Sequence, residues 1–170
     1  MRASTTRSDT PAAAEKIAIG LLARREHSAF ELQQKLKLRG FAAEIIGVVI
    51  ERLAAQGWQS DARYSEAYVR MRVARGYGLA AIRAELRQRG VAADCVSTAL
   101  AEADVDWLDC AQQHVARYYQ QPPADRDALL RRYRHLLNRG FSPEQARQAS
   151  VFWPDEASMK SHWAVPDDFA

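Results

Sequence analysis

The sequence has few of the residues from which catalytic and metal sites are built. It contains two cysteines, Cys95 and Cys110, which are fifteen positions apart and not in the Cys-x-x-Cys spacing of a metal or redox pair. It has no glycine-rich loop followed by Lys and Ser or Thr, the motif that holds phosphates. Serines and carboxylates occur in no arrangement typical of nucleophilic or acid–base catalysis. We therefore expect a protein that is not an enzyme, with no catalytic residue, no cofactor and no metal.

Histidine is sparse as well. The chain has four histidines, with no i, i+4 pair among them and no acidic residue beside them at the spacing of a metal site. We expect each of them to lie on the surface or at a helix end: His27, His114, His135 and His162.

Long apolar segments are also missing. No stretch reaches the length of about 18 apolar residues that a membrane-spanning helix needs. The first residues contain no apolar segment like that of a signal peptide. Two cysteines without pair spacing are typical of a reducing compartment. We therefore expect a cytoplasmic protein with no membrane contact.

The residues that are present favour helices. The chain of 170 residues has 8 glycines, 6 prolines and few runs of β-branched residues, and its hydrophobic content of 48% is enough for a core. Apolar residues recur at helical spacing, as at Ile46, Val49 and Leu53. The sequence therefore predicts an all-α fold.

One short motif occurs three times, with its copies fifty residues apart: Leu36–Phe41, Leu86–Val91 and Leu136–Phe141. In each copy an arginine precedes a glycine and an apolar residue follows it. Glycine adopts the left-handed conformation just past a helix end at little cost, and the next residue then folds back onto the last turn. The preceding cation suits the negative end of the helix dipole. We therefore predict structural helix stops at Gly40, Gly90 and Gly140.

The spacing of the apolar residues predicts nine helices, grouped three by three around this motif. Units of about 50 residues are marginal alone, so we expect them to stack as three tandem three-helix repeats in an elongated, solenoid-like array. We predict the divisions as a disordered N-terminus (1–11), repeat 1 (12–58), repeat 2 (59–104), repeat 3 (105–150) and an acidic, aromatic C-terminal tail (151–170). Two capping boxes are predicted, at Ser28–Glu31 and Ser142–Gln145.

Charge is unevenly distributed along the chain. Residues 61–90 carry seven Lys/Arg and three Asp/Glu, whereas residues 91–125 carry one and six. Arginines interleaved with tyrosines on helices fit contact with a phosphate backbone or an acidic protein groove. The alternative, helix-end cations on a solvated face, stays open. The predicted partner- or DNA-binding residues are Arg63, Arg70, Arg72, Arg75, Tyr77, Arg83, Arg87 and Arg89, with a smaller basic patch at Arg126, Arg131, Arg132, Arg134 and Arg139.

The middle of the chain resembles the central signature of the RecX family. The matching residues are an acidic-Arg-Tyr helix at 60–70, the Gly-Tyr-Gly turn at 76–78 and the Ile-Arg-x-Glu-Leu helix with its Arg-Gly stop at 82–91. The resemblance extends over about residues 13–150. It implies a helical repeat protein that acts as a negative regulator of the RecA recombinase. In that role it would bind the RecA–DNA filament and inhibit its ATPase, strand-exchange and coprotease activities.

The resemblance also implies weak binding of single- or double-stranded DNA, and we expect a monomer. The alternative function is that of a direct DNA-binding protein built of helix-turn-helix-like units. Against that alternative, the polar positions of the second helix differ between the repeats: Gln33/Lys37, Arg83/Arg87 and Tyr133/Leu137.

Overall fold

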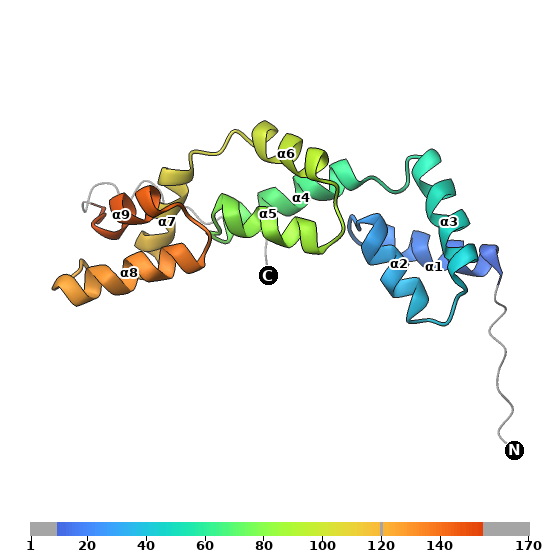
Figure 1. Cartoon of the computed structure of the whole chain (residues 1–170), viewed down its shortest axis with the longest axis horizontal. Coiled ribbons are helices and arrows are strands. Elements are labelled where there is room, and N and C mark those ends of the chain that lie inside the picture. Colours follow the sequence, from blue (N-terminus) through green and yellow to red (C-terminus); the bar gives the residue numbers. More distant parts are fainter. Residues whose placement is uncertain (1–9, 120, 155–170) are drawn as a thin grey trace, which may run out of the picture. The chain divides into compact units, whose positions relative to one another are not determined.

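The computed structural model describes residues 10–119 and 121–154 (Figure 1). These residues form nine α-helices and no strand, which confirms the all-α prediction. Residues 1–9 and 155–170, which hold most of the predicted N-terminal and C-terminal tails and His162, lie outside the described part. The helices are α1 (Pro11–Leu22), α2 (Ala29–Lys37), α3 (Ala43–Ala55), α4 (Asp61–Ala74), α5 (Leu79–Gln88), α6 (Ala93–Glu102), α7 (Trp107–Tyr118), α8 (Arg126–Asn138) and α9 (Pro143–Ser150).

The chain divides into two compact units. Among the described residues, unit 1 consists of residues 10–72 and 82–104, and unit 2 consists of residues 73–81, 105–119 and 121–154. Unit 1 therefore holds α1–α3 and α6 with most of α4 and α5, whereas unit 2 holds α7–α9 and the segment between α4 and α5.

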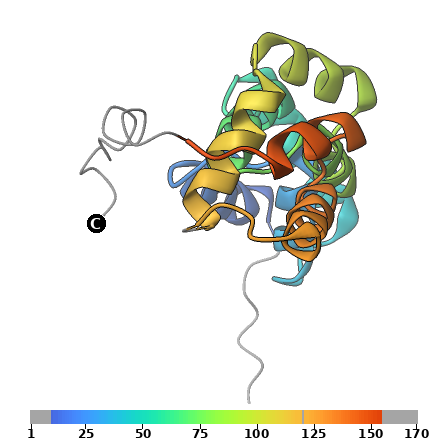
Figure 2. The same ribbon diagram turned by 90° about the vertical axis from the view of Figure 1, so that its left-hand side faces the viewer.

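Each group of three helices has its own core. In α1–α3 the small side chains of Ala14 and Ala18 let α1 approach α3, and Leu36 closes the cluster from α2. In α7–α9, which face the viewer in Figure 2, Val115 and Leu136 are fully buried in the corresponding cluster. The buried residues of α4–α6 and the turn after α5 are Tyr64, Tyr68, Val69, Ile82, Leu86, Val91, Val96, Ala99 and Leu100.

The three repeated glycines share one backbone geometry. Gly40, Gly90 and Gly140 have φ of +88°, +74° and +85°, a region that L residues occupy at a cost. In each copy the N–H of the next residue donates to the carbonyl five positions back, for example Val91 to Leu86 at 3.2 Å. The second helix of each triplet therefore ends in the same hydrogen-bonded turn.

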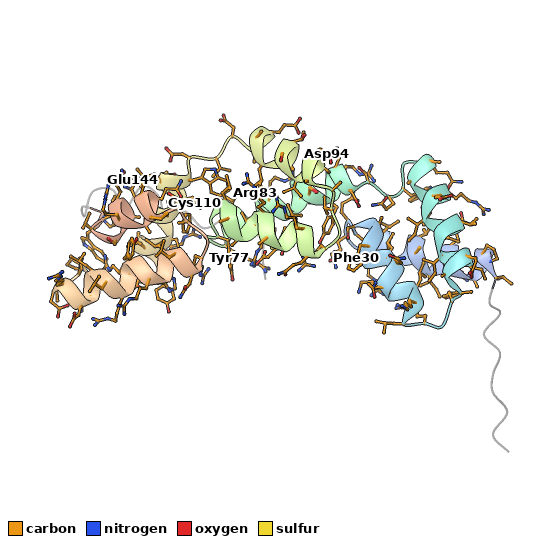
Figure 3. The ribbon with its side chains drawn as sticks, in the orientation of Figure 1. Phe30, Tyr77, Arg83, Asp94, Cys110 and Glu144 are labelled. Carbon is orange, nitrogen blue, oxygen red and sulfur yellow. The ribbon has the colours of Figure 1, made fainter. Side chains whose placement is uncertain are left out.

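At two of these turns, residues at the start of an earlier helix lie against the glycine. We call each of these contacts a junction. In unit 1, which contains the first junction, the Ser28 hydroxyl donates to the carbonyl of Arg89 at 2.8 Å, and Phe30 lies against Gly90 (Figure 3). In unit 2, which contains the second junction, the Gly78 N–H donates to the carbonyl of Arg139 at 2.8 Å. Ser28 and Gly78 are fifty positions apart, as are Arg89 and Arg139, so equivalent positions meet in the two repeats, through a hydroxyl donor in the first and a backbone N–H donor in the second.

The predicted capping boxes have different outcomes. Ser142 and Gln145 form a complete one, with both reciprocal hydrogen bonds, which confirms that prediction. At α2 only half forms: the Ser28 hydroxyl accepts from the Glu31 N–H, but the Glu31 carboxylate binds other groups. The prediction of a full box there is wrong because Glu31 has stronger, cationic donors within reach.

None of the helices in the described part is long and apolar enough to cross a membrane.

Candidate functional site

The predicted binding residues fall into both units. Most belong to unit 1, on α4 and α5. Arg75 and Tyr77 belong to the segment between these helices, in unit 2. The arginines among them fall into two groups: some bind other elements of the fold, and others are half-buried or exposed to solvent.

Arg89 lies in a network around Glu31, a side chain of α2 that is 12% exposed. The Glu31 carboxylate accepts from Arg89 at 2.6 Å, from Tyr64 at 3.0 Å and from Arg25 and His27 at 2.9 Å each. Arg89 therefore joins α2 to the end of α5. Its side chain is 39% exposed and serves the first junction.

The network shifts the pKa values of its members. Burial alone would raise the pKa of Glu31, but the hydrogen bonds from Arg25, His27 and Tyr64 outweigh it, and the pKa is lowered. Burial raises the pKa of Tyr64, and the charge of Glu31 adds to that effect. Glu31 is thus an anion and Tyr64 a neutral donor at neutral pH.

Arg72 is paired within the same region. Its guanidinium forms an ion pair with Glu85 of α5, and the Tyr68 hydroxyl donates to the other Glu85 oxygen at 2.7 Å. Arg89 also lies over the Tyr68 ring, 4.8 Å from its centroid. We call this set the acid-paired network: Glu31, Tyr64, Tyr68, Arg72, Glu85 and Arg89.

Arg63 has a structural position too. It forms an ion pair with Glu26 at 2.8 Å and donates to the carbonyls of Gly57 and Trp58, at 2.9 Å and 3.1 Å. These carbonyls follow the end of α3. Arg63 thus ties the start of α4 to the turn before it.

The other three predicted arginines of unit 1 are only weakly paired or have no carboxylate partner among the described residues. Arg70 is 70% exposed and lies 4.0 Å from Glu66, at the limit of an ion pair. Arg87 is exposed and Arg83, labelled on α5 in Figure 3, is half-buried. In the described part of the chain, no carboxylate lies within ion-pair distance of Arg83 or Arg87. Within the described part of unit 1, these three are the predicted binding residues that do not join one helix to another element.

In unit 2, Arg139 contacts a carbonyl and an aromatic ring instead of a carboxylate. Arg139 donates to the carbonyl of Arg75 at 3.0 Å and lies over the Tyr77 ring, 4.6 Å from its centroid. The Arg75 side chain itself is exposed. Tyr77 thus has a packing role beside the Gly140 turn.

The expectation that every histidine lies on the surface or at a helix end is wrong. His27 is 3% exposed and binds Glu31, and His114 is 7% exposed. The Nε2 atoms of His114 and His135 are 2.8 Å apart, so one ring donates to the other. In the fifty-residue register His114 occupies the position of Tyr64 and His135 that of Glu85. Tyr64 donates to Glu31 and Glu85 accepts from Tyr68, so the register alone does not predict the histidine pair.

The smaller basic patch predicted in the third repeat is also different in the structure. Arg132 is 2% exposed and is no surface residue. Its guanidinium donates to the carbonyls of Gln121, Ser150 and Phe152 and lies 4.6 Å from the centre of the Tyr119 ring. Burial lowers its pKa. Arg132 therefore anchors the chain after α9.

The histidine pair and its neighbours do not form a metal centre. Within the described residues, no group of three or more His, Cys, Asp or Glu side chains is placed to hold a metal ion. Cys95 and Cys110 are free thiols, and burial raises the pKa of Cys110 to about 11.

Comparison with known proteins assigns the family. Three family models match in chain order, described as the first, second and third three-helix domains of RecX, over residues 14–53, 60–100 and 104–149. The regulatory protein RecX of Halorhodospira halophila is 43% identical over 148 residues, which are 85% of this chain and 92% of the relative. That of Pseudomonas entomophila is 42% identical over 137 residues, 80% and 88% of the two chains.

Solved structures agree on the fold. The crystal structure of RecX from Lactobacillus salivarius superposes with a TM-score of 0.68 at 20% identity, over 84% of this chain and 95% of the other. A second crystal structure of a regulatory protein RecX gives a TM-score of 0.66 at 23% identity, over 82% and 72%. The resemblance seen in the signature at 60–91 is thus confirmed, and this chain belongs to the RecX family of regulatory proteins.

Proposed function

We propose that this protein is a negative regulator of the RecA recombinase. It binds the RecA–DNA filament in the cytoplasm and inhibits ATP hydrolysis, strand exchange and coprotease activity. The observation that carries the proposal is the match of all three three-helix domains to a family of regulatory proteins. The protein acts by occupying a surface and needs no chemistry of its own.

The exposed arginines of unit 1 support binding to an acidic surface. Arg83 and Arg87 are four positions apart on α5, so they share one face of that helix. Because neither is paired with a carboxylate in the described residues, a partner's carboxylates or phosphates meet no internal competitor. Arg70 on α4 adds a weakly paired cation. We propose these three as the contact residues, with Arg63, Arg72 and Arg89 holding them in place.

The first test is DNA-dependent ATP hydrolysis by the cognate recombinase, titrated with this protein at two salt concentrations. Single-stranded DNA is kept in excess, so that competition for bare DNA is suppressed. Substoichiometric protein is expected to inhibit, because one bound regulator obstructs several recombinase subunits. Inhibition that disappears with excess DNA would contradict the proposal.

A double variant locates the contact. Arg83→Ala/Arg87→Ala is expected to keep the fold and to need about tenfold more protein for half inhibition, a loss of roughly 1.4 kcal/mol. The matched control is Arg131→Ala/Arg134→Ala, which removes the same charge from two exposed positions of α8. Equal weakening by both pairs would mean that net charge alone sets the affinity.

Direct DNA binding is the second candidate, favoured by the same exposed arginines. It predicts tight binding to duplex DNA without the recombinase and an affinity that falls steeply with salt. The salt series of the ATPase experiment, repeated with duplex DNA alone, separates the two functions.

A further inference from the structure

Unit 2 contains a small basic cavity that the proposed function does not use. Its volume is about 180 Å³, and it is lined by the end of α4 and by α7, through Ala74, Arg75, His114, Arg117 and Tyr118. A buried water needs roughly 10–15 Å³ of such space, so the cavity admits a group much larger than a water molecule.

The cations at this cavity are not neutralised from within. In the part of the chain that the structure describes, no carboxylate is within ion-pair distance of Arg75 or Arg117, the two arginines that line the cavity. Arg117 makes one hydrogen bond, to the Ala74 carbonyl at 3.3 Å, which leaves most of its five donors available. The acid-paired network of unit 1 is different, because Glu31 and Glu85 accept from its arginines. The cavity therefore has a positive potential that an anion offsets.

Aromatic rings form one side of the cavity. The rings of His114 and Tyr118 stack 5.8 Å apart, and Tyr118 also packs on His135 with centroids 4.5 Å apart. These contacts fix the Tyr118 ring, yet the residue remains 57% exposed. A fixed ring with an open side is a stacking platform for a planar group.

The backbone close to His114 leaves no room for a larger residue. A Cβ atom added to Gly76 would lie 2.3 Å from His114 Nδ1. Glycine at this position therefore lets the segment between α4 and α5 lie directly against the His114 ring, with Arg75 and Arg117 lining the cavity.

From this arrangement we infer that the cavity binds a nucleotide unit, with its base stacked on Tyr118 and its phosphate held by Arg75 and Arg117. A metal cation is the wrong occupant, because Arg117 and Arg139 lie close to the His114–His135 pair and repel it. Their charge, together with burial, lowers the pKa of His114 to about 4, which keeps the imidazole neutral and leaves the arginines as the anion-binding groups. The nucleotide comes either from a single DNA strand or from a free mononucleotide.

The inference deepens the DNA-contact part of the proposed function, and its test omits the recombinase so that the two fail separately. Fluorescein-labelled oligo(dT) is titrated with the full chain, and dTMP or ATP is added as a competitor. Tyr118→Leu keeps apolar contact with His135 but removes the π face, and Arg117→Ala removes the phosphate donor. Each is expected to weaken oligo(dT) binding about tenfold, the typical effect of losing one stacked base or one phosphate contact.

The matched control is Arg39→Ala, which removes one charge from an exposed position that does not line the cavity and belongs to neither predicted basic patch. It is expected to weaken binding less than threefold, a roughly estimated effect of net charge alone. Displacement by dTMP or ATP at the same site would identify a free nucleotide as the ligand; failure to displace would identify the strand, and both outcomes support the cavity. Equal loss in Arg117→Ala and Arg39→Ala, unchanged binding in Tyr118→Leu, or no binding of any probe would overturn it.

Discussion

The two junctions join equivalent positions of the chain but differ in their electrostatics. In both, the carbonyl of the arginine before the glycine accepts a hydrogen bond, from the Ser28 hydroxyl in the first and from the Gly78 N–H in the second. In the first junction the arginine before the glycine, Arg89, is neutralised by Glu31. In the second, Arg139 occupies the position fifty residues later and contacts a carbonyl and the Tyr77 ring. Glu85 of the first network is replaced by His135 at the same register. A repeated fold thus fixes where the chain docks, while the side chains decide whether the charge there is used internally or is available to a ligand.

The largest effect is expected when the docking turns are filled. Gly140→Ala would put a Cβ 2.3 Å from the backbone N of Ala81, whereas at Gly40 nothing lies within 4 Å of the added atom. Both variants suffer the left-handed strain, on the order of 1 kcal/mol. Gly140→Ala is expected to lose about 4 kcal/mol of unfolding free energy, because a backbone contact must also move.

Urea unfolding followed by circular dichroism measures this difference. Gly90→Ala belongs with Gly140→Ala, since its Cβ would lie 2.5 Å from the Cβ of Phe30. Equal losses in Gly40→Ala and Gly140→Ala would mean that the close approach is not part of the folded state.

The second largest effect on the unfolding free energy is expected when the partly buried acid Glu31, in contrast to the exposed acid Glu144, is removed. Glu31→Ala removes the acceptor for four donors at the first junction and leaves Arg89 and His27 without it. We expect a loss of about 3 kcal/mol, because Arg89 loses its charge partner and the buried His27 ring loses its acceptor. Glu144→Ala at α9 is the control: its pair with Arg147 is exposed to solvent, so the unfolding free energy is expected to stay close to that of the unmodified protein. Thermal unfolding of the two variants measures the difference in stability. Similar small losses of stability in both would show that the Glu31 network does not stabilise the first junction.

The helices and their ends could be predicted because both depend on local sequence. The Arg-Gly-apolar motif predicts where a helix ends, and the spacing of the apolar residues predicts the helices themselves. Together they predict the all-α fold. The pairing of the arginines could not be predicted in this way. Arg63 and Glu26 are 37 positions apart in the sequence, and Arg89 and Glu31 are 58 positions apart. Only the tertiary fold brings the members of each pair together.

The histidine pair lies between these two cases. His114 and His135 are 21 positions apart and show no metal spacing. Alignment of the repeats at fifty residues places them over Tyr64 and Glu85, two members of the acid-paired network. The repeat register therefore marks positions that take part in side-chain networks, but it does not predict the pair itself, because Tyr64 donates to Glu31 and Glu85 accepts from Tyr68.

The third effect concerns pH. Burial, and after it the charges of Arg139, His135 and Arg117, lowers the pKa of His114 to about 4. A histidine whose folded-state pKa is lowered contributes stability above its unfolded value of about 6.5, and this is lost as pH falls toward 4. For this residue we expect a loss of about 2 kcal/mol between pH 7 and pH 5. The lowered pKa of Glu31 acts in the same direction but at more acidic pH, because that carboxylate loses its stabilisation only as it becomes protonated.

The variant His114→Gln tests the assignment, because glutamine does not titrate. Its unfolding free energy, from urea curves at pH 7 and pH 5, is expected to fall by about 2 kcal/mol less than that of the unmodified protein. An identical pH dependence in both proteins would assign the titration to other groups.

The smallest effect is expected when the hydroxyl group is removed from Tyr68 or from Tyr118, which occupy equivalent positions in two repeats. Tyr68 donates its hydroxyl to Glu85 at 2.7 Å, and Tyr118, fifty positions later, has no such carboxylate among the described residues. Tyr68→Phe is expected to lose about 1 kcal/mol, the net value of a hydrogen bond to a partly solvated carboxylate that keeps its pair with Arg72. Tyr118→Phe is expected to change the unfolding free energy by less than about 0.5 kcal/mol, because the residue is 57% exposed and its ring contacts remain. Paired urea titrations of the two variants measure the difference. Since Tyr118→Phe keeps the stacking face, it should also bind oligo(dT) like the unmodified protein, and a loss of binding would mean that the hydroxyl, and not the ring, contacts the nucleotide.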